Sequence, residues 1–271
     1  SEILTDNSAN IVFSFEDVTI VSTPTLILDG SYFKEDSING TSVTYDLSSF
    51  LTNEATMEYT FKIFDVVGNY SEGTGVLLYD LYPPTLTITI DSSTFKTIFE
   101  ATVNYFDKIS GVATLLILLD TLSSEVNVNE RFGSYLYTHD IPEGFEGTVT
   151  FSVTGYDELS HSTQVATQII FDNHAPEITS VLFDEVSIGA GETISASAGT
   201  HTVLVSYVEE FLKDATLLIE DTTSSTPLAP TTITDTTLEW ELNVTTDTTL
   251  MIYLDDVVNH ETQFLFSVRI Q

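Results

Sequence analysis

Three similar stretches recur along this chain of 271 residues. Each is a run of alternating apolar and polar residues that ends in an aspartate and a small polar turn: ATMEYTFKIFDVVGNYS, GTVTFSVTGYDELSHST and TTLMIYLDDVVNHET. The aligned aspartates are Asp65, Asp157 and Asp256, which are 92 and 99 residues apart. Self-similarity at a long, nearly fixed period indicates a chain built from consecutive structural units of one kind.

Two further markers repeat with nearly the same period. The stretches TPTLILDG, VATLLILLD and DATLLIED end at or near Asp29, Asp120 and Asp221, at steps of 91 and 101 residues. The stretches YDLYPP and FDNHAP contain Asp80 and Asp172, again 92 residues apart. Because three independent markers agree, we interpret the chain as three homologous units of roughly 90 to 100 residues, the usual size of an immunoglobulin-like domain.

Prolines mark the expected boundaries. Pro83–Pro84 and Pro176 each follow the last predicted strand of a unit. Proline lacks the backbone donor that a central strand needs, so it suits the beginning of an edge strand. We therefore expect domains at residues 1–82, 83–174 and 175–271.

The pattern within each unit predicts strands throughout. The chain contains 17 Phe and 12 Tyr, and short alternating runs are separated by Gly, Asn, Asp and Ser. Units with six or seven strands and no room for crossover helices predict an all-β fold of three tandem immunoglobulin-like antiparallel β-sandwich domains. Trp240 alternates with Leu238 and Leu242, which predicts a core position. In the second unit the expected strands are 85–90, 100–105, 112–119, 134–138, 147–155 and 163–171.

The first unit is short at its beginning. Only about ten residues precede its strand near Ile11, whereas about 18 precede the corresponding strand near Ala101. We therefore expect its first strand to be short or missing. Two interpretations follow: the chain is a fragment of a longer array, or its first domain accepts a strand from a neighbouring subunit.

The charge is strongly one-sided. Seven Lys and Arg residues face 41 Asp and Glu residues, which gives a formal net charge of −34. Such a chain repels nucleic acids and anionic membranes, so neither is expected as a partner. The longest mainly apolar run, Val112–Leu119, is too short to span a bilayer, so no direct membrane insertion is expected. The chain has no cysteine, so disulfides do not report its compartment.

The chain resembles, over essentially its whole length, the tandem immunoglobulin-like repeats of bacterial and archaeal cell-surface proteins, of the S-layer or adhesin-stalk type, and the first unit matches well. Those repeats carry a D-x-x-G-N-x-S turn and an Asp-x-x-x-Pro junction, which match Asp65, Gly68, Asn69 and Ser71, and then Asp80, in this chain. The second unit has Ser160 and His161 in place of Gly-Asn, and the third has Asn259 without the glycine.

The resemblance implies a non-catalytic extracellular structural element of a prokaryotic cell surface, such as a lattice, filament or stalk spacer. Its expected partners are further copies of itself or neighbouring surface proteins. The alternative is an adhesive module that recognises a glycan or a protein. Enzyme motifs such as G-x-S-x-G, G-x-G-x-x-G and H-E-x-x-H are missing from the sequence, so catalysis is not expected.

The resemblance also implies a calcium site, because some members of this family bind Ca²⁺ between domains. Calcium takes six to eight oxygen ligands, normally including several carboxylates. The candidate ligands here are Asp65, Asn69, Asp80, Asp157, Glu158 and Asp172. The alternative is that Asp65 and Asp157 cap tight turns with their own side chains.

No cofactor other than calcium is expected. The five histidines have no paired spacing, and cysteine is lacking, so the sequence argues against a transition-metal site. We interpret them as solvated residues of turns and loops: His139, His161, His174, His201 and His260.

Overall fold

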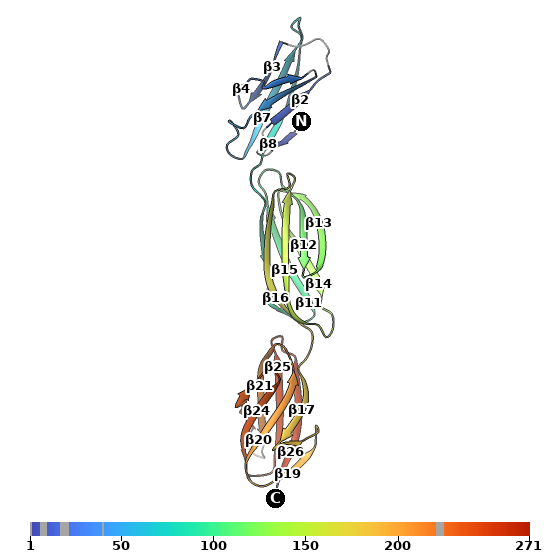
Figure 1. The fold of residues 1–271 in the computed structure, drawn as a ribbon, viewed down its shortest axis with the longest axis vertical. Coiled ribbons are helices and arrows are strands. Elements are labelled where there is room, and N and C mark those ends of the chain that lie inside the picture. Colours follow the sequence, from blue (N-terminus) through green and yellow to red (C-terminus); the bar gives the residue numbers. More distant parts are fainter. Residues whose placement is uncertain (1, 6–9, 17–21, 40, 221–224) are drawn as a thin grey trace. The chain divides into compact units, whose positions relative to one another are not determined.

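The computed structural model describes residues 2–5, 10–16, 22–39, 41–220 and 225–271. Asp221, one of the repeat markers, lies outside these residues. Within the described part of the chain the regular elements are β-strands in six sheets (Figure 1). The sheets form three immunoglobulin-like sandwiches, which confirms the predicted fold class. No helix in this part of the chain could cross a lipid bilayer.

The first sandwich has a five-stranded sheet in the order β1-β8-β7-β3-β4 and a three-stranded sheet in the order β2-β6-β5. Its core joins both sheets, because Tyr45 and Leu77 are fully buried in one cluster. No described strand pairs with the outer edge of β2, whereas the corresponding strands of the other sandwiches are covered. The strands are β1 (Glu2–Thr5), β2 (Asn10–Ser14), β3 (Ser22–Leu28), β4 (Ser31–Phe33), β5 (Ser37–Asn39), β6 (Ser42–Asp46), β7 (Ala55–Phe64) and β8 (Tyr70–Tyr79).

The second sandwich combines the sheets β10-β16-β15-β12-β13 and β14-β11-β9. Aromatic rings join the two layers, with Phe99 5.6 Å from Phe171 and Tyr137 5.3 Å from Phe151 between ring centroids. All six strands predicted for this unit are present. The strands are β9 (Thr85–Thr89), β10 (Thr94–Phe95), β11 (Ile98–Phe106), β12 (Val112–Leu119), β13 (Leu122–Glu130), β14 (Phe132–Asp140), β15 (Glu146–Asp157) and β16 (Ser162–Asp172).

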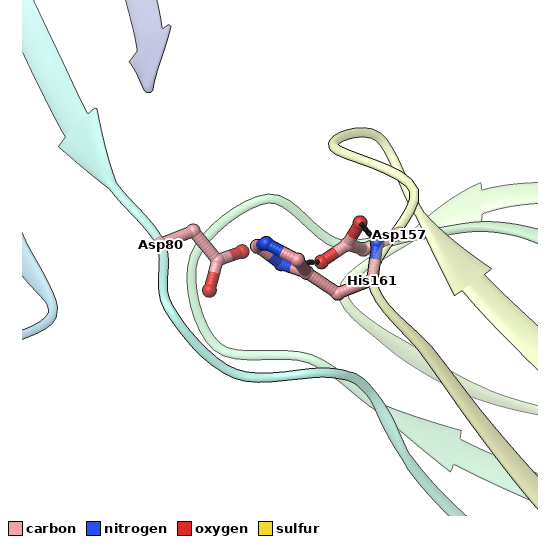
Figure 2. A group of neighbouring side chains, drawn as sticks. All are labelled: Asp80, Asp157 and His161. Carbon is pink, nitrogen blue, oxygen red and sulfur yellow. Dashed lines mark hydrogen bonds and ion pairs between the residues drawn. The ribbon is translucent and has the colours of Figure 1, made fainter. Parts of the chain in front are cut away.

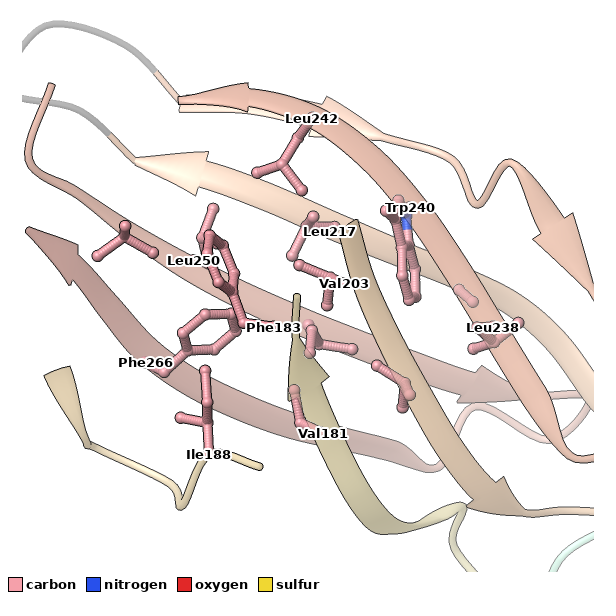
Figure 3. Packing of buried hydrophobic residues seen from close by; sticks show 14 of the residues in the cluster. Val181, Phe183, Ile188, Val203, Leu217, Leu238, Trp240, Leu242, Leu250 and Phe266 are labelled. Carbon is pink, nitrogen blue, oxygen red and sulfur yellow. The ribbon is translucent and has the colours of Figure 1, made fainter. Parts of the chain in front are cut away.

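The third sandwich combines the sheets β18-β17-β20-β24-β23 and β19-β26-β25-β21-β22. Trp240 is 1% exposed in its core, among side chains from both sheets (Figure 3), which confirms the predicted position. Its indole Nε1 donates to the Leu228 carbonyl at 3.0 Å. The strands are β17 (Glu177–Phe183), β18 (Val186–Ser187), β19 (Thr193–Ala196), β20 (Gly199–Val208), β21 (Leu212–Glu220), β22 (Ser225–Leu228), β23 (Thr232–Ile233), β24 (Thr237–Val244), β25 (Thr248–Asp256) and β26 (Glu261–Ile270).

The three sandwiches share details of strand pairing as well as strand order. In each, one short strand pairs in parallel with the last strand, as β1 with β8, β10 with β16 and β19 with β26. The register is also interrupted near the start of β3, β12 and β21, the equivalent strand of each five-stranded sheet. A recurring irregularity of this kind supports the structural repeat.

The chain divides into two compact units. The first comprises residues 1–89, 101–137 and 150–167, and the second comprises 90–100, 138–149 and 168–271. Each of the polar clusters described below lies within one of these units.

Candidate functional site

The three aspartates that mark the repeat close the same turn, between the last two strands of each sandwich. One oxygen of each carboxylate accepts the backbone N–H groups two and four residues further on. A residue with positive φ follows at the fourth position: Gly68 (φ 93°), Ser160 (φ 70°) and Asn259 (φ 63°). The turn-capping interpretation is therefore confirmed. The donors are Val67 and Asn69 for Asp65, Leu159 and His161 for Asp157, and Val258 and His260 for Asp256.

The fifth residue of each turn contacts the second oxygen of the same aspartate. In the first sandwich Asn69 Nδ2 donates to Asp65 Oδ2 at 2.6 Å. In the later sandwiches a histidine takes this place, with His161 Nδ1 2.8 Å from Asp157 Oδ2 and His260 Nδ1 2.6 Å from Asp256 Oδ2. An imidazole keeps a second ring nitrogen for another partner, whereas the asparagine amide keeps an N–H and a carbonyl oxygen.

The first cluster places Asp80 beside the turn formed by Asp157 and His161. Their ligand atoms lie within 4.8 Å of one another, and the imidazole lies between the two carboxylates (Figure 2). Asp80 is 1% exposed, and its two oxygens accept from Tyr82 N at 3.3 Å and Ser110 N at 3.0 Å. Each oxygen of Asp80 therefore has a backbone donor. Burial raises the pKa of Asp157, although its turn hydrogen bonds act in the opposite direction.

The second cluster repeats this arrangement with Asp172, Asp256 and His260, again within 4.8 Å. Both aspartates are 0% exposed. Asp172, which lies between the second and third sandwiches, has few hydrogen bonds. Its Oδ1 accepts only from His174 N at 3.4 Å, and its Oδ2 has no partner among the described residues. Burial, followed by the charge of Asp256, raises the pKa of Asp172.

The third cluster consists of Glu146, His174 and Glu209, whose ligand atoms also lie within 4.8 Å of one another. Glu146 begins β15, His174 follows β16 by two residues, and Glu209 directly follows β20. Burial raises the pKa of Glu209 to about 8, and the nearby Glu146 carboxylate acts in the same direction. The charge of Asp172 contributes to this shift, so the second and third clusters are electrostatically connected.

The residues proposed from the sequence as calcium ligands do not come together in their two expected groups. Asp65 and Asn69 precede β8 and Asp80 follows it, so a strand of ten residues, roughly 33 Å long, separates them. Strand β16 separates Asp157 and the exposed Glu158 from Asp172 in the same way. The structure instead brings Asp80 to Asp157, and Asp172 to Asp256.

The interpretation of the histidines as solvated residues of turns and loops is wrong for three of them. His139 lies in β14. His201 lies in β20, is 6% exposed and contacts Asp184 at 2.6 Å. The His260 side chain is 14% exposed, because it packs against the buried Asp256. The sequence patterns also did not indicate Glu146, Glu209 and Asp256 as site residues. One available signal was spacing, since Glu54 and Glu146 are 92 residues apart, like Asp80 and Asp172.

Clusters of buried carboxylates with an imidazole nitrogen suit a cation or a shared proton. A buried charge is costly unless it is paired or coordinates a metal. The described ion pairs of lysine are made elsewhere, by Lys62 with Glu72 and by Lys213 with Asp255. The acidic composition thus leaves these clusters without a lysine or arginine partner in the described part of the chain.

No protein-family model matches the chain, and no curated protein matches it. Among solved structures, it is similar to a tetra-tandem repeat from the extending region of a large adhesion protein, with TM-score 0.41 and 14% identity over 100% of this chain and 74% of that one. It is also similar to a bacterial ice-binding adhesin, with TM-score 0.36 and 13% identity over 99% and 94% of the two chains. Fibronectin(III)-like modules of Clostridium thermocellum CbhA give TM-score 0.39 and 14% identity over 63% and 88%.

Proposed function

We propose that the chain is a non-catalytic, extracellular structural element of a prokaryotic cell surface, acting as a lattice, filament or stalk spacer. Its units correspond to the domains 1–82, 83–174 and 175–271. Its partners are further copies of the chain or neighbouring surface proteins. Its function is then to connect sandwiches in series and to associate with these partners, with no turnover of a substrate.

One observation carries this proposal: the same carboxylate–histidine arrangement recurs where one sandwich leads into the next. Asp80 directly follows β8, and Asp172 ends β16. Each meets the aspartate–histidine turn of the following sandwich. A polar site repeated in step with the fold favours a role in joining repeats, because a catalytic site needs to occur only once.

Calcium is the cation that we propose for these junctions. Its preference for carboxylate oxygens fits Asp80 with Asp157, and Asp172 with Asp256. A net charge of −34 also disfavours close association of copies unless cations reduce the repulsion. Calcium would then stabilise the sandwiches and permit assembly.

Sedimentation velocity and thermal unfolding, first in millimolar calcium and then with excess EGTA, test this function. We expect calcium to raise the melting temperature, because a ligand that binds only the folded state stabilises it by mass action. We also expect reversible oligomers in calcium. The Asp172→Asn variant should respond less, and a variant at the exposed Asp91 should respond like the original chain. A chain that stays monomeric in both solutions contradicts the assembly function.

The second candidate function is adhesive binding of a glycan or a protein. Large apolar side chains favour it, since Tyr32 is 76%, Phe132 72% and Leu136 58% exposed. Aromatic side chains of this kind are enriched at binding surfaces. A glycan array and a pull-down with surface extracts separate the two functions: specific binding by a monomeric chain, lost in Tyr32→Ala or Phe132→Ala, favours adhesion.

A further inference from the structure

We infer that Glu146, His174 and Glu209 form a binding site for a divalent transition-metal cation such as Zn²⁺. This inference goes beyond the proposed calcium-dependent assembly and does not depend on it. The three residues come from separate segments of the chain, and the fold brings their ligand atoms within 4.8 Å of one another. His174 Nδ1 lies 3.9 Å from Glu146 Oε2.

Unsatisfied buried atoms distinguish this site from an ordinary acidic surface. Glu209 is 7% exposed, and its Oε2 has no hydrogen-bond partner among the described residues. The Nδ1 atom of His174 is also buried without a hydrogen-bond partner from the described chain. Buried polar atoms normally have a partner, so two unpaired atoms in one cluster indicate a missing ligand.

The backbone holds the carboxylates in place while leaving one oxygen of each available. Glu209 Oε1 accepts from Phe211 N at 2.8 Å, and Glu146 Oε1 accepts from Glu210 N. Such outer contacts orient metal ligands and fix the geometry that the ion meets. His174 also lines a surface groove with Asn173 and Pro176, which provides a path for an ion.

The donor set favours a transition metal over calcium, because His174 Nδ1 has no hydrogen-bond partner among the described residues. In the two clusters proposed for calcium, the Nδ1 atoms of His161 and His260 already contact Asp157 and Asp256. Calcium binds oxygen ligands, whereas imidazole nitrogen suits zinc and related first-row ions. Zinc accepts histidine nitrogen and carboxylate oxygen together in a four-coordinate site. The charge of Asp172 adds negative potential beside the three ligands.

The preceding repeat lacks this site although it has the corresponding positions. Tyr82 lies 92 residues before His174 and offers no imidazole, and Glu54 lies 92 residues before Glu146. Asp107 takes the place of Glu209 after β11, and its Oδ1 accepts from Ile109 N at 3.0 Å and Gly111 N at 2.8 Å. We therefore expect one zinc ion per chain, bound where the second sandwich leads into the third.

Isothermal titration of the intact chain with ZnCl₂, and separately with MnCl₂ and CaCl₂, tests the inference. We expect one zinc ion per chain, and a zinc affinity at least about tenfold weaker in His174→Ala and in Glu209→Gln. His139→Ala removes a histidine that stacks near Phe171 outside the three clusters, and it should leave the affinity unchanged. Circular dichroism and Trp240 fluorescence establish that each variant is folded.

Three results would overturn the inference: no zinc binding, zinc binding that His174→Ala leaves intact, or calcium binding at these residues with equal affinity. Failure here is distinguishable from failure of the proposed function, because the titration is read on single chains and calcium-dependent association is measured separately. A chain that does not associate in calcium but still binds zinc contradicts the assembly function and leaves the zinc site standing.

Discussion

Replacing the aspartates that lie between the sandwiches, Asp80 and Asp172, should lower stability at the first position and not at the second. Asp80 and Asp172 are 92 residues apart, are both buried and each lie beside an aspartate–histidine turn. Asp80 Oδ2 accepts from Ser110 N at 3.0 Å, and Oδ1 accepts from Tyr82 N. In Asp80→Asn an amide group replaces one acceptor, so one of these two hydrogen bonds is lost, although Tyr82 N also donates to Glu54 Oε1 at 3.2 Å. Asp172 Oδ2 has no such bond to lose within the described residues.

The expected magnitude follows from these contacts. A hydrogen bond to a charged group contributes about 1.5–3 kcal/mol, and relief of the repulsion between Asp80 and Glu54 offsets part of its loss, so Asp80→Asn should cost about 1–2 kcal/mol. For a sandwich of roughly 90 residues, that lowers the melting temperature by about 4–16 °C. Asp172→Asn should leave the melting temperature unchanged or raise it, because it removes a buried charge that faces Asp256.

Differential scanning calorimetry in EDTA measures both variants, and pH provides an internal check. Asp256, Glu146 and His260 act on Asp172, and burial together with Asp256 raises its pKa above the ordinary value of 3.8. The folded state therefore takes up a proton more readily than the unfolded chain, and ionised Asp172 destabilises the fold above its raised pKa. The advantage of Asp172→Asn should be largest near neutral pH and vanish below about pH 3.8. A loss of stability in Asp172→Asn as large as that in Asp80→Asn refutes the reasoning.

Three other substitutions test the fold. Tyr45→Phe should raise the free energy of unfolding by about 1 kcal/mol in denaturant titrations, because the buried Tyr45 hydroxyl has no partner in the described part of the chain. Leu217→Ala should lower the stability reported by Trp240 fluorescence by about 3–4 kcal/mol, whereas Leu26→Ala, in the first sandwich, should leave that transition unmoved. Ser160→Gly should raise the melting temperature by relieving the left-handed backbone at φ 70°, a gain of about 1 kcal/mol; an unchanged or lower value contradicts this.

The strands were predictable wherever burial alternates along the chain. Leu115, Ile117 and Leu119 are buried on one side of β12, and this period of two is visible in the sequence. Strand β13 was missed because LSSEVNVNE lies at a sheet edge and is mostly exposed, and its apolar alternation is limited to Val126 and Val128. Strand β10 has only two residues, too few to show a period.

The turns were predictable for a different reason: their hydrogen bonds are local. Asp157 caps groups two and four residues away, so the sequence contains the whole motif. The clusters are not local. Glu146 and Glu209 are 63 residues apart in sequence, and only the paths of β15 and β20 bring them together. A sequence pattern does not show which residues so far apart along the chain lie close together in the fold.

The two regions between successive sandwiches are built alike, so the few residues that differ between them indicate what each region can bind. Asp107 and Glu209 both directly follow the equivalent strand and both accept an N–H two residues further on. The shorter Asp107 also accepts from Gly111 N, which ties it to its own turn. The glutamate has one more methylene and keeps Oε2 unpaired in the interior. A junction that served only to cap turns would gain nothing from a longer carboxylate, a second glutamate and a histidine. Their combination in one repeat is what we expect if that junction has acquired a ligand of its own.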